Sequence, residues 1–365
     1  MNAHTSFLEI ISPGAFASIQ DVGRRGWRRH GVPWAGALDP HLMRLANALV
    51  GQSEYNPVIE CIDAGFRVAA RGGPVRVGVA GAAELEHLCG GKWRQVSPWR
   101  SLTLAQDEHL RVRRMASGRL SVWAVSGLVV SQTLGSASTY ARAGLGGVDG
   151  KLLKPGVMLP IRASAPGPER LIPTLPARSR AVIRAVPGPQ ADHFTPQAMD
   201  LLVQSTYRVT DAADRMGVRL EGPALAHCGP REIVSDATVP GSIQVPGNGQ
   251  PIVLLADAQT AGGYPKIGTV ISADLALVAD TRPGDTLCFV WVSVSDGEAA
   301  ARAAERRTRA LLDSICLVWP GGVDEHALYR DNLVSGVVNA CDAEAPACTD
   351  RSSKGQPSEN PAGGG

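Results

Sequence analysis

Glycine and proline recur along the whole chain and leave little room for long helices. The 365 residues include 41 glycines and 26 prolines, with short apolar runs between them. The runs 75–79, 120–125, 181–186 and 286–292 are each bounded by turn-forming or polar residues, which is typical of strands. Evenly spaced short strands favour a closed or sandwiched β architecture, since closure removes exposed sheet edges.

Three segments are predicted to be helical. Asp39 can cap a helix over 40–50, and Gly51 suits the left-handed stop after it. Thr195 followed by proline predicts a second helix that extends to about residue 203 by the same logic. The third, 297–315, is rich in Ala, Arg and Glu, and its apolar face is thin at first.

Composition excludes several classes of protein. The 36 basic and 34 acidic residues leave a net charge of +2, without the basic stripe of a nucleic-acid-binding protein. No run reaches the ~18 apolar residues of a membrane helix, and the first ten residues lack the basic start of a secretory signal. Seven scattered cysteines indicate reduced thiols, so we expect a cytoplasmic protein.

The organisation along the chain suggests two β-rich domains. The segment 163–180 contains four prolines and little periodicity, which makes it the best candidate for a boundary. We therefore expect an N-terminal domain over 6–165 and a C-terminal domain over 180–315. Residues 343–365, rich in Pro, Ser and Gly, are expected to form a disordered tail.

Searches for common motifs narrow the chemistry. The sequence Gly146-Gly147-Val148-Asp149-Gly150-Lys151 is one residue short of a phosphate loop, and Leu152 replaces its Ser or Thr. The histidines show no metal-ligand spacing, so no metal site is expected. An Ala-Met-Lys-Met stretch, the usual site of biotin attachment, is missing, so no biotin is expected on this chain.

Three polar, glycine-rich stretches carry a resemblance to a known family. They are Ser18-Ile19-Gln20-Asp21-Val22-Gly23-Arg24-Arg25-Gly26, then Leu134-Gly135-Ser136-Ala137-Ser138-Thr139, then Asp214-Arg215-Met216-Gly217-Val218-Arg219-Leu220 with Gly241-Ser242-Ile243-Gln244 and Asp257-Ala258-Gln259-Thr260-Ala261-Gly262-Gly263-Tyr264-Pro265-Lys266-Ile267-Gly268. Together they resemble the signature of the allophanate-hydrolase-subunit-2 family. It includes KipA-type proteins, the C subunit of 5-oxoprolinase and the carboxyltransferase half of urea carboxylase.

This resemblance implies a fold, a reaction and partners. The implied fold is mainly β, with two cyclophilin-like β-barrel domains and a few short helices. The implied reaction is hydrolysis of 5-oxo-L-proline to L-glutamate, with ATP and Mg²⁺, by a complex that contains A-type and B-type (KipI-like) subunits. Two alternatives stay open: a KipA-type binding protein that antagonises a kinase inhibitor, and the carboxyltransferase component of a biotin-dependent urea or amide carboxylase.

The residues of these stretches supply the candidate site. Lys266 follows a Gly-Tyr-Pro sequence, where an ammonium in a loop could meet a phosphate or carboxylate; the alternative is a solvated loop lysine. Asp257 follows an apolar run and could act at a strand end or cap the next turn. We expect Lys266 and Asp257 to be catalytic, and we assign no nucleophile. The candidate substrate-binding residues are Gln20, Asp21, Arg24, Ser136, Ser138, Thr139, Asp214, Arg215, Gln244, Gln259, Thr260, Gly262, Gly263 and Tyr264. Asp21 and Arg24 could instead form a structural ion pair.

Overall fold

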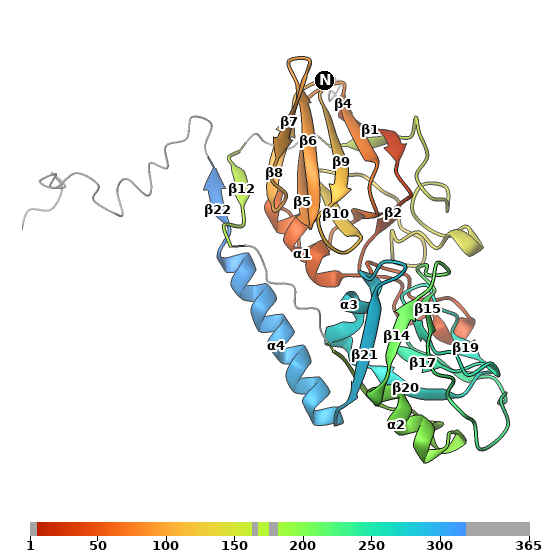
Figure 1. Cartoon of the computed structure of the whole chain (residues 1–365). Coiled ribbons are helices and arrows are strands. Elements are labelled where there is room, and N and C mark those ends of the chain that lie inside the picture. Colours follow the sequence, from red (N-terminus) through yellow and green to blue (C-terminus); the bar gives the residue numbers. More distant parts are fainter. Residues whose placement is uncertain (1–5, 163–166, 175–181, 319–365) are drawn as a thin grey trace, which may run out of the picture. The chain divides into compact units, whose positions relative to one another are not determined.

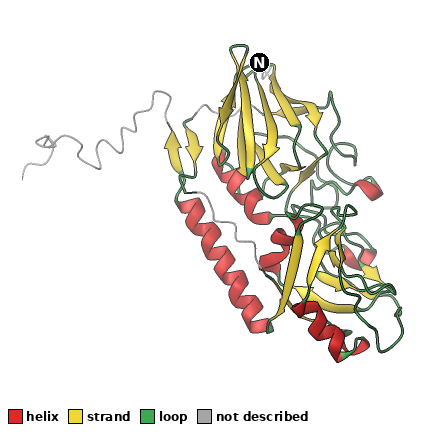
Figure 2. Cartoon of the chain, in the orientation of Figure 1, coloured by secondary structure: helices red, strands yellow, loops and turns green. Residues whose placement is uncertain are grey.

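The computed structural model describes residues 6–162, 167–174 and 182–318, and these form mainly β structure (Figure 1). Strands dominate both the first and the second part of the chain, and the helices are few (Figure 2). The predicted fold class is confirmed. The expected tail, 343–365, lies outside the described residues, as does part of the expected boundary 163–180.

The N-terminal half consists of two sheets that share a core. The six-stranded sheet has the order β11 (Met158–Ile161), β1 (Ser6–Pro13), β4 (Phe66–Arg71), β9 (His109–Met115), β6 (Ala83–Cys89) and β7 (Lys92–Val96). The seven-stranded sheet has the order β2 (Phe16–Gln20), β3 (Val58–Ile62), β10 (Leu120–Val125), β5 (Val75–Gly81), β8 (Arg100–Leu104), β12 (Glu169–Leu171) and β22 (Cys316–Val318). Buried residues of both sheets, among them Leu8, Val68, Val77 and Trp123, form one apolar cluster.

The C-terminal half is a closed barrel. Its order is β13 (Ile183–Pro187), β20 (Lys266–Val270), β17 (Ser242–Gln244), β18 (Ile252–Leu254), β15 (Gly217–Glu221), β14 (Thr206–Val209) and β21 (Thr286–Trp291). A two-stranded ladder, β16 (Asp236–Ala237) with β19 (Ala261–Gly262), lies outside this ring of strands. The four strand runs predicted from the sequence correspond to β5, β10, β13 and β21.

The predicted helices are present, with one shifted start. Helix α1 (Pro40–Leu49) has the Asp39 carboxylate as its N-cap, and Gly51 follows with a φ of 75°. Helix α2 (Pro196–Gln204) is capped by Thr195. Helix α4 (Val294–Asp313) begins three residues before the predicted start, because Ser293 and Asp296 form a reciprocal capping box there. The short helix α3 (Leu275–Ala279) was not predicted. Nor were the 3₁₀ turns η1 (Arg28–His30), η2 (Ala141–Ala143), η3 (Ala191–His193) and η4 (Ser272–Asp274).

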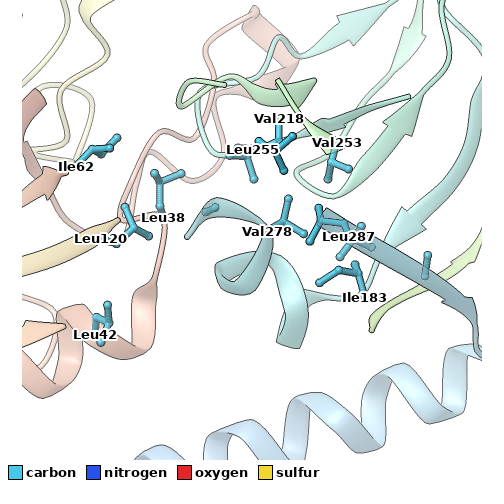
Figure 3. Packing of buried hydrophobic residues seen from close by; sticks show 14 of the residues in the cluster. Leu38, Leu42, Ile62, Leu120, Ile183, Val218, Val253, Leu255, Val278 and Leu287 are labelled. Atoms are coloured by element: carbon cyan, nitrogen blue, oxygen red, sulfur yellow. The ribbon is translucent and has the colours of Figure 1, made fainter. Parts of the chain in front are cut away.

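A second apolar cluster joins the two halves. Figure 3 shows Leu38 and Leu120 of the N-terminal half on one side, with Val278 of α3 and Leu255 of the barrel facing them. All four side chains are buried. Burial of apolar surface therefore stabilises the arrangement of the halves as well as each half by itself.

Polar contacts reinforce this junction at separate places. Asp280, at the end of α3, accepts hydrogen bonds from the N–H groups of Arg119 and Leu120 at 2.8 Å each. Arg44 of α1 donates to Glu305 of α4, with 2.5 Å between Nη1 and Oε2. Helix α4 then leads to β22, which pairs with β12 at the edge of the N-terminal sheet. Of the helices described, none combines the length and apolar character needed to cross a membrane.

Candidate functional site

Asp21 anchors the loop that carries the predicted serines. Its carboxylate, directly after β2, accepts hydrogen bonds from Ser136 Oγ at 2.5 Å and Ser138 Oγ at 2.6 Å. The backbone N–H groups of Ala137 and Gly23 also donate to it, at 2.7 and 2.8 Å. Four donors satisfy most of the capacity of one carboxylate. Asp21 therefore positions the loop and has little capacity left for a ligand.

Gln20 connects the same loop to the segment that crosses between the halves. Its Nε2 donates to Ser18 Oγ at 2.8 Å and to the Thr139 carbonyl at 3.2 Å. Its Oε1 accepts from the N–H of Gly36 at 3.2 Å. Because the side chain is buried and bonded at both ends, its role is structural.

Arg24 and Thr139 each keep one buried polar atom without a partner in the described residues. Arg24 donates to the Ser138 carbonyl, yet its Nη1 has no acceptor, and Thr139 Oγ1 has no hydrogen bond. Burial lowers the pKa of Arg24, and the charges of Asp21 and Asp257 oppose that effect. Arg24 is thus a buried cation with spare donor capacity close to two carboxylates.

Arg215 forms a buried ionic cluster that spans both halves. Its Nε and Nη2 donate to the two oxygens of Asp257 at 3.0 and 2.9 Å, a bidentate arrangement. Its Nη1 donates to Glu60 of β3, and Nη2 also donates to the Gly36 carbonyl at 2.6 Å. The other Glu60 oxygen accepts from the N–H of Leu38 at 2.6 Å. Asp257, predicted to be catalytic, is therefore held in place by Arg215.

The charges of this cluster support one another. Burial opposes the charge of Arg215, but Asp257 and then Glu60 outweigh it and raise the pKa of the guanidinium. Burial raises the pKa of Glu60, and Arg215 partly offsets this. A buried ion pair needs such mutual compensation, because each charge alone would be strongly destabilising.

A cavity of about 380 Å³ opens where the barrel meets η2 of the N-terminal half. Gln244, at the end of β17, lines this cavity and is 2% exposed. Its Oε1 accepts a hydrogen bond from Gln259 Nε2 at 3.1 Å, while its own Nε2 has no partner in the described residues. The remaining lining residues are Arg142, Asp211, Ala212, Ala213, Asp214, Met216, Gly217, Arg219, Ile252, Leu254, Gln259 and Tyr264.

Charged and aromatic side chains form the outer part of this cavity. Asp214 bonds to the N–H groups of Met216 and Gly217 at 2.8 and 3.2 Å, which orders its turn. Arg142 of η2 lies 3.8 Å from Asp214, and both side chains are largely exposed. Tyr264 is 39% exposed. The cavity thus has a buried amide donor inside and a guanidinium at its mouth.

Lys266 is not in a loop, as the sequence analysis expected, but begins β20. There it pairs across the sheet with Gln244, because the irregular Gly-Tyr-Pro sequence ends at the preceding residue. Its side chain is 2% exposed, and Nζ lies 2.7 Å from Asp236 Oδ2. Lys266, with some help from Gln190, lowers the pKa of Asp236 to about 2. Lys266 is therefore a buried cation with a carboxylate partner.

The glycines after Gln259 do not line the cavity, but Gly262 packs closely against the Gln244 side chain. A Cβ on Gly262 would lie 2.5 Å from Gln244 Nε2, so only glycine fits there without displacement. The Gly263 carbonyl accepts from the N–H of Ile233 at 2.8 Å, and that of Thr260 from the N–H of Thr238 at 3.1 Å. These two positions organise the loops around the ladder of β16 and β19.

A second, larger cavity lies elsewhere at the junction. It measures about 540 Å³ and is bordered mainly by apolar residues of α1, α3, α4 and the segment 34–38. Asp21 is the one predicted site residue in its lining. The cluster of candidates around Gln244 therefore favours the smaller cavity as the site.

The structure arranges the predicted residues in three neighbouring groups. Gln20, Asp21, Arg24, Ser136, Ser138 and Thr139 form the first, Arg215 and Asp257 the second, and Asp214, Gln244, Gln259, Thr260, Gly262, Gly263, Tyr264 and Lys266 the third. Sequence reasoning missed Glu60, Arg142 and Asp236. A signal existed for Glu60, a charged residue inside the apolar run 58–62. Arg142, in η2, and Asp236, in β16, are exposed and carry no local signal.

Comparison with known proteins identifies the family to which this chain belongs. The chain belongs to the family described as "Carboxyltransferase domain, subdomain A and B", whose sequence model matches residues 30–291. The C subunit of 5-oxoprolinase from Escherichia coli is 36% identical over 308 residues, which cover 82% of this chain and 96% of that protein. The protein of the same name from Haemophilus influenzae is 35% identical over 309 residues, 84% of this chain and 97% of that protein.

A solved structure shares the fold. The K. lactis urea amidolyase aligns with a TM-score of 0.75 at 24% identity, over 86% of this chain. This chain spans 21% of that longer protein. At this identity the similarity shows a common fold, and function has to be argued from the site.

Proposed function

We propose that this chain is a component of an ATP-dependent enzyme that hydrolyses 5-oxo-L-proline to L-glutamate together with A-type and B-type subunits. The observation that carries the proposal is the match with the C subunit of E. coli 5-oxoprolinase across 96% of that protein. The smaller cavity, beside β15, β17 and β18, supports it, because a buried amide donor and an outer guanidinium suit a small molecule with a carbonyl and a carboxylate.

The reaction needs help because a lactam carbonyl is a poor electrophile. ATP supplies a phosphoryl group that makes the carbonyl oxygen a good leaving group. In the net reaction water breaks the C–N bond of the ring, and ATP is cleaved to ADP and phosphate. Residues of this chain bind the lactam, orient its carbonyl and hold the surrounding charges in place.

The buried cations near the cavity do not fit a triphosphate. Lys266 is paired with Asp236, and Arg215 with Asp257. Both charges are already compensated, and Arg24 keeps only Nη1 without an acceptor, so we propose that ATP and its Mg²⁺ bind mainly to a partner subunit. No biotin is expected on this chain.

Two other functions follow from the same family. The family description "Carboxyltransferase domain" favours a carboxyltransferase role in a biotin-dependent carboxylase, in which the cavity would take urea or another small amide. A KipA-type binding role would require the partner but no turnover. Both of these functions predict that glutamate release from 5-oxoproline does not depend on this chain.

The experiment is glutamate release from 5-oxoproline by the purified chain combined with A-type and B-type subunits, each omitted in turn, with and without ATP. Glutamate that depends on this chain and on ATP supports the proposal. A silent mixture whose B-type subunit still binds the chain contradicts it and favours the KipA-type role. Transfer of carboxylate from carboxybiotin to urea favours the carboxyltransferase role.

A further inference from the structure

Gln244 stands out among the buried polar residues of the described chain. It is 2% exposed and lines the smaller cavity, and its Nε2 has no acceptor. A buried donor without a partner is unfavourable, so such groups are rare in folded proteins and need an explanation. A ligand that brings an acceptor into the cavity supplies one.

The orientation of this amide is set by its neighbours. Gln259 Nε2 donates to Gln244 Oε1 at 3.1 Å, which leaves Nε2 as the free end. Gly262 packs so closely that an added Cβ would lie 2.5 Å from Nε2. Strand β17 is paired on both sides, with β18 and β20, so the backbone that carries Gln244 is also held. The donor is therefore preorganised.

The charges at the mouth restrict what the ligand can be. Arg142 and Arg219 line the cavity together with Asp211 and Asp214. Asp214 uses Oδ1 for its own turn, while the Arg142 guanidinium stays largely exposed, 3.8 Å from Asp214. Arg142 can thus pair with a carboxylate that enters the cavity.

We infer that Gln244, oriented by Gln259, donates to the ring carbonyl of a lactam, and that Arg142 binds the carboxylate of the same molecule. The inference rests on the proposed function and names the part of the substrate that each residue recognises. Gln244 is then a substrate-binding residue and Gln259 a positioning residue.

The assignment is tested by binding of three small probes to the full chain, measured by calorimetry. The probes are 5-oxoproline, 2-pyrrolidinone, which lacks the carboxylate, and proline, which lacks the ring carbonyl. The unaltered chain should bind 5-oxoproline best and proline worst. Gln244→Glu keeps an acceptor for Gln259 but replaces the free donor with an acceptor. The variant should therefore bind both lactams about tenfold more weakly, or worse. Arg142→Gln should weaken the binding of 5-oxoproline but not the binding of 2-pyrrolidinone.

Two further variants separate recognition from general damage. Gln259→Glu removes the donor to Gln244 Oε1 and favours rotation of the Gln244 amide. It should therefore weaken the binding of both lactams, although Gln244 itself is unchanged. Gln197→Glu makes the same chemical change at an exposed position near the N-terminus of α2, outside the cavity lining, and should leave binding unchanged. Unfolding midpoints of all variants identify any that have lost the fold.

The outcomes distinguish this inference from the proposed function. Unchanged lactam binding by a folded Gln244→Glu variant overturns the inference. A second pair of results also overturns it. In that case the isolated, unaltered chain does not bind 5-oxoproline, and Gln244→Glu leaves the KM for 5-oxoproline in the complete mixture unchanged. Binding that depends on Gln244, in a mixture that releases no glutamate, supports the inference and contradicts the proposed function. No binding and no turnover overturns both.

Discussion

The Arg215 guanidinium donates to the Glu60 carboxylate, and this ion pair ties the C-terminal barrel to β3 of the N-terminal half. The two residues are 155 positions apart in the chain, and both are buried. Arg215→Met would leave the carboxylates of Glu60 and Asp257 buried without their cation. We expect a loss of about 3–5 kcal/mol in the free energy of unfolding, measured by urea denaturation.

A matched control for that variant is Arg208→Met, which breaks an exposed pair with Glu221. It should have little effect, because solvent screens exposed pairs. The double variant Arg215→Met/Glu60→Leu should lose less stability than Arg215→Met alone, since it removes one of the two orphaned carboxylates. Equal losses in the single and double variants would contradict the assigned role of Glu60.

Asp236 gives the fold an acid-sensitive contact. Lys266, followed by Gln190, lowers the pKa of its carboxyl from 3.8 to about 2. A depressed carboxyl pKa stabilises the folded state above the unfolded pKa, and this contribution is lost as the pH falls through the folded pKa. Between about pH 4 and pH 2, Asp236→Asn should therefore lose less thermal stability than the unaltered chain. The control is Asp200→Asn, on the exposed side of α2. It should lose as much thermal stability over this pH range as the unaltered chain does.

Gly262 tests how closely the backbone packs against Gln244, a residue that lines the cavity. Gly262→Ala would place a Cβ 2.5 Å from Gln244 Nε2 and displace that amide. The KM for 5-oxoproline in the complete mixture should rise about tenfold, with a small change in stability. Gly229→Ala is the control, because its Cβ would meet His193 Nδ1 at an ordinary 3.8 Å. If both variants have the same KM, the close contact at Gly262 is irrelevant to binding.

Asp21 tests the anchor of the loop that contains Ser136 and Ser138. Asp21→Asn would turn one acceptor oxygen into an NH₂ group that faces donors. The buried mismatch should cost about 1–3 kcal/mol of unfolding free energy. Asp107→Asn, on an exposed turn, provides the comparison. Chemical denaturation of both variants gives the difference, and equal stability would show that the carboxylate is dispensable.

Local signals in the sequence predicted the elements whose causes are local. The cap-and-proline pairs at Asp39 and Thr195 predicted α1 and α2 because each cap bonds within its own turn. The family resemblance predicted the mainly β fold. Asp236 could not be predicted, since its partner is 30 positions away on another strand and no pattern near it reports a buried lysine.

The candidate site was predicted as a set of residues but not as an arrangement. Asp21 and Arg24 were expected to bind substrate or to pair with each other. Instead, the Asp21 carboxylate bonds to the serine loop and Arg24 donates to backbone carbonyls of that loop. Which of two polar residues meets a ligand depends on the hydrogen bonds each already makes, and these join segments more than 100 positions apart. The catalytic role of Lys266 and Asp257 stays a prediction.

The contacts of Arg215, Asp280 and Arg44 between the halves also affect how a small molecule can reach the smaller cavity. Halves held together at three separate places, with apolar packing between them, resist separation. A small molecule that enters the smaller cavity then passes Arg142 and Tyr264, whose side chains are exposed. Exposed side chains change rotamer within nanoseconds, whereas hinge motions of domains take microseconds to milliseconds. For the proposed enzyme, we therefore expect rotamer changes of these two side chains to control substrate entry and product release. Neither step should limit the rate of turnover.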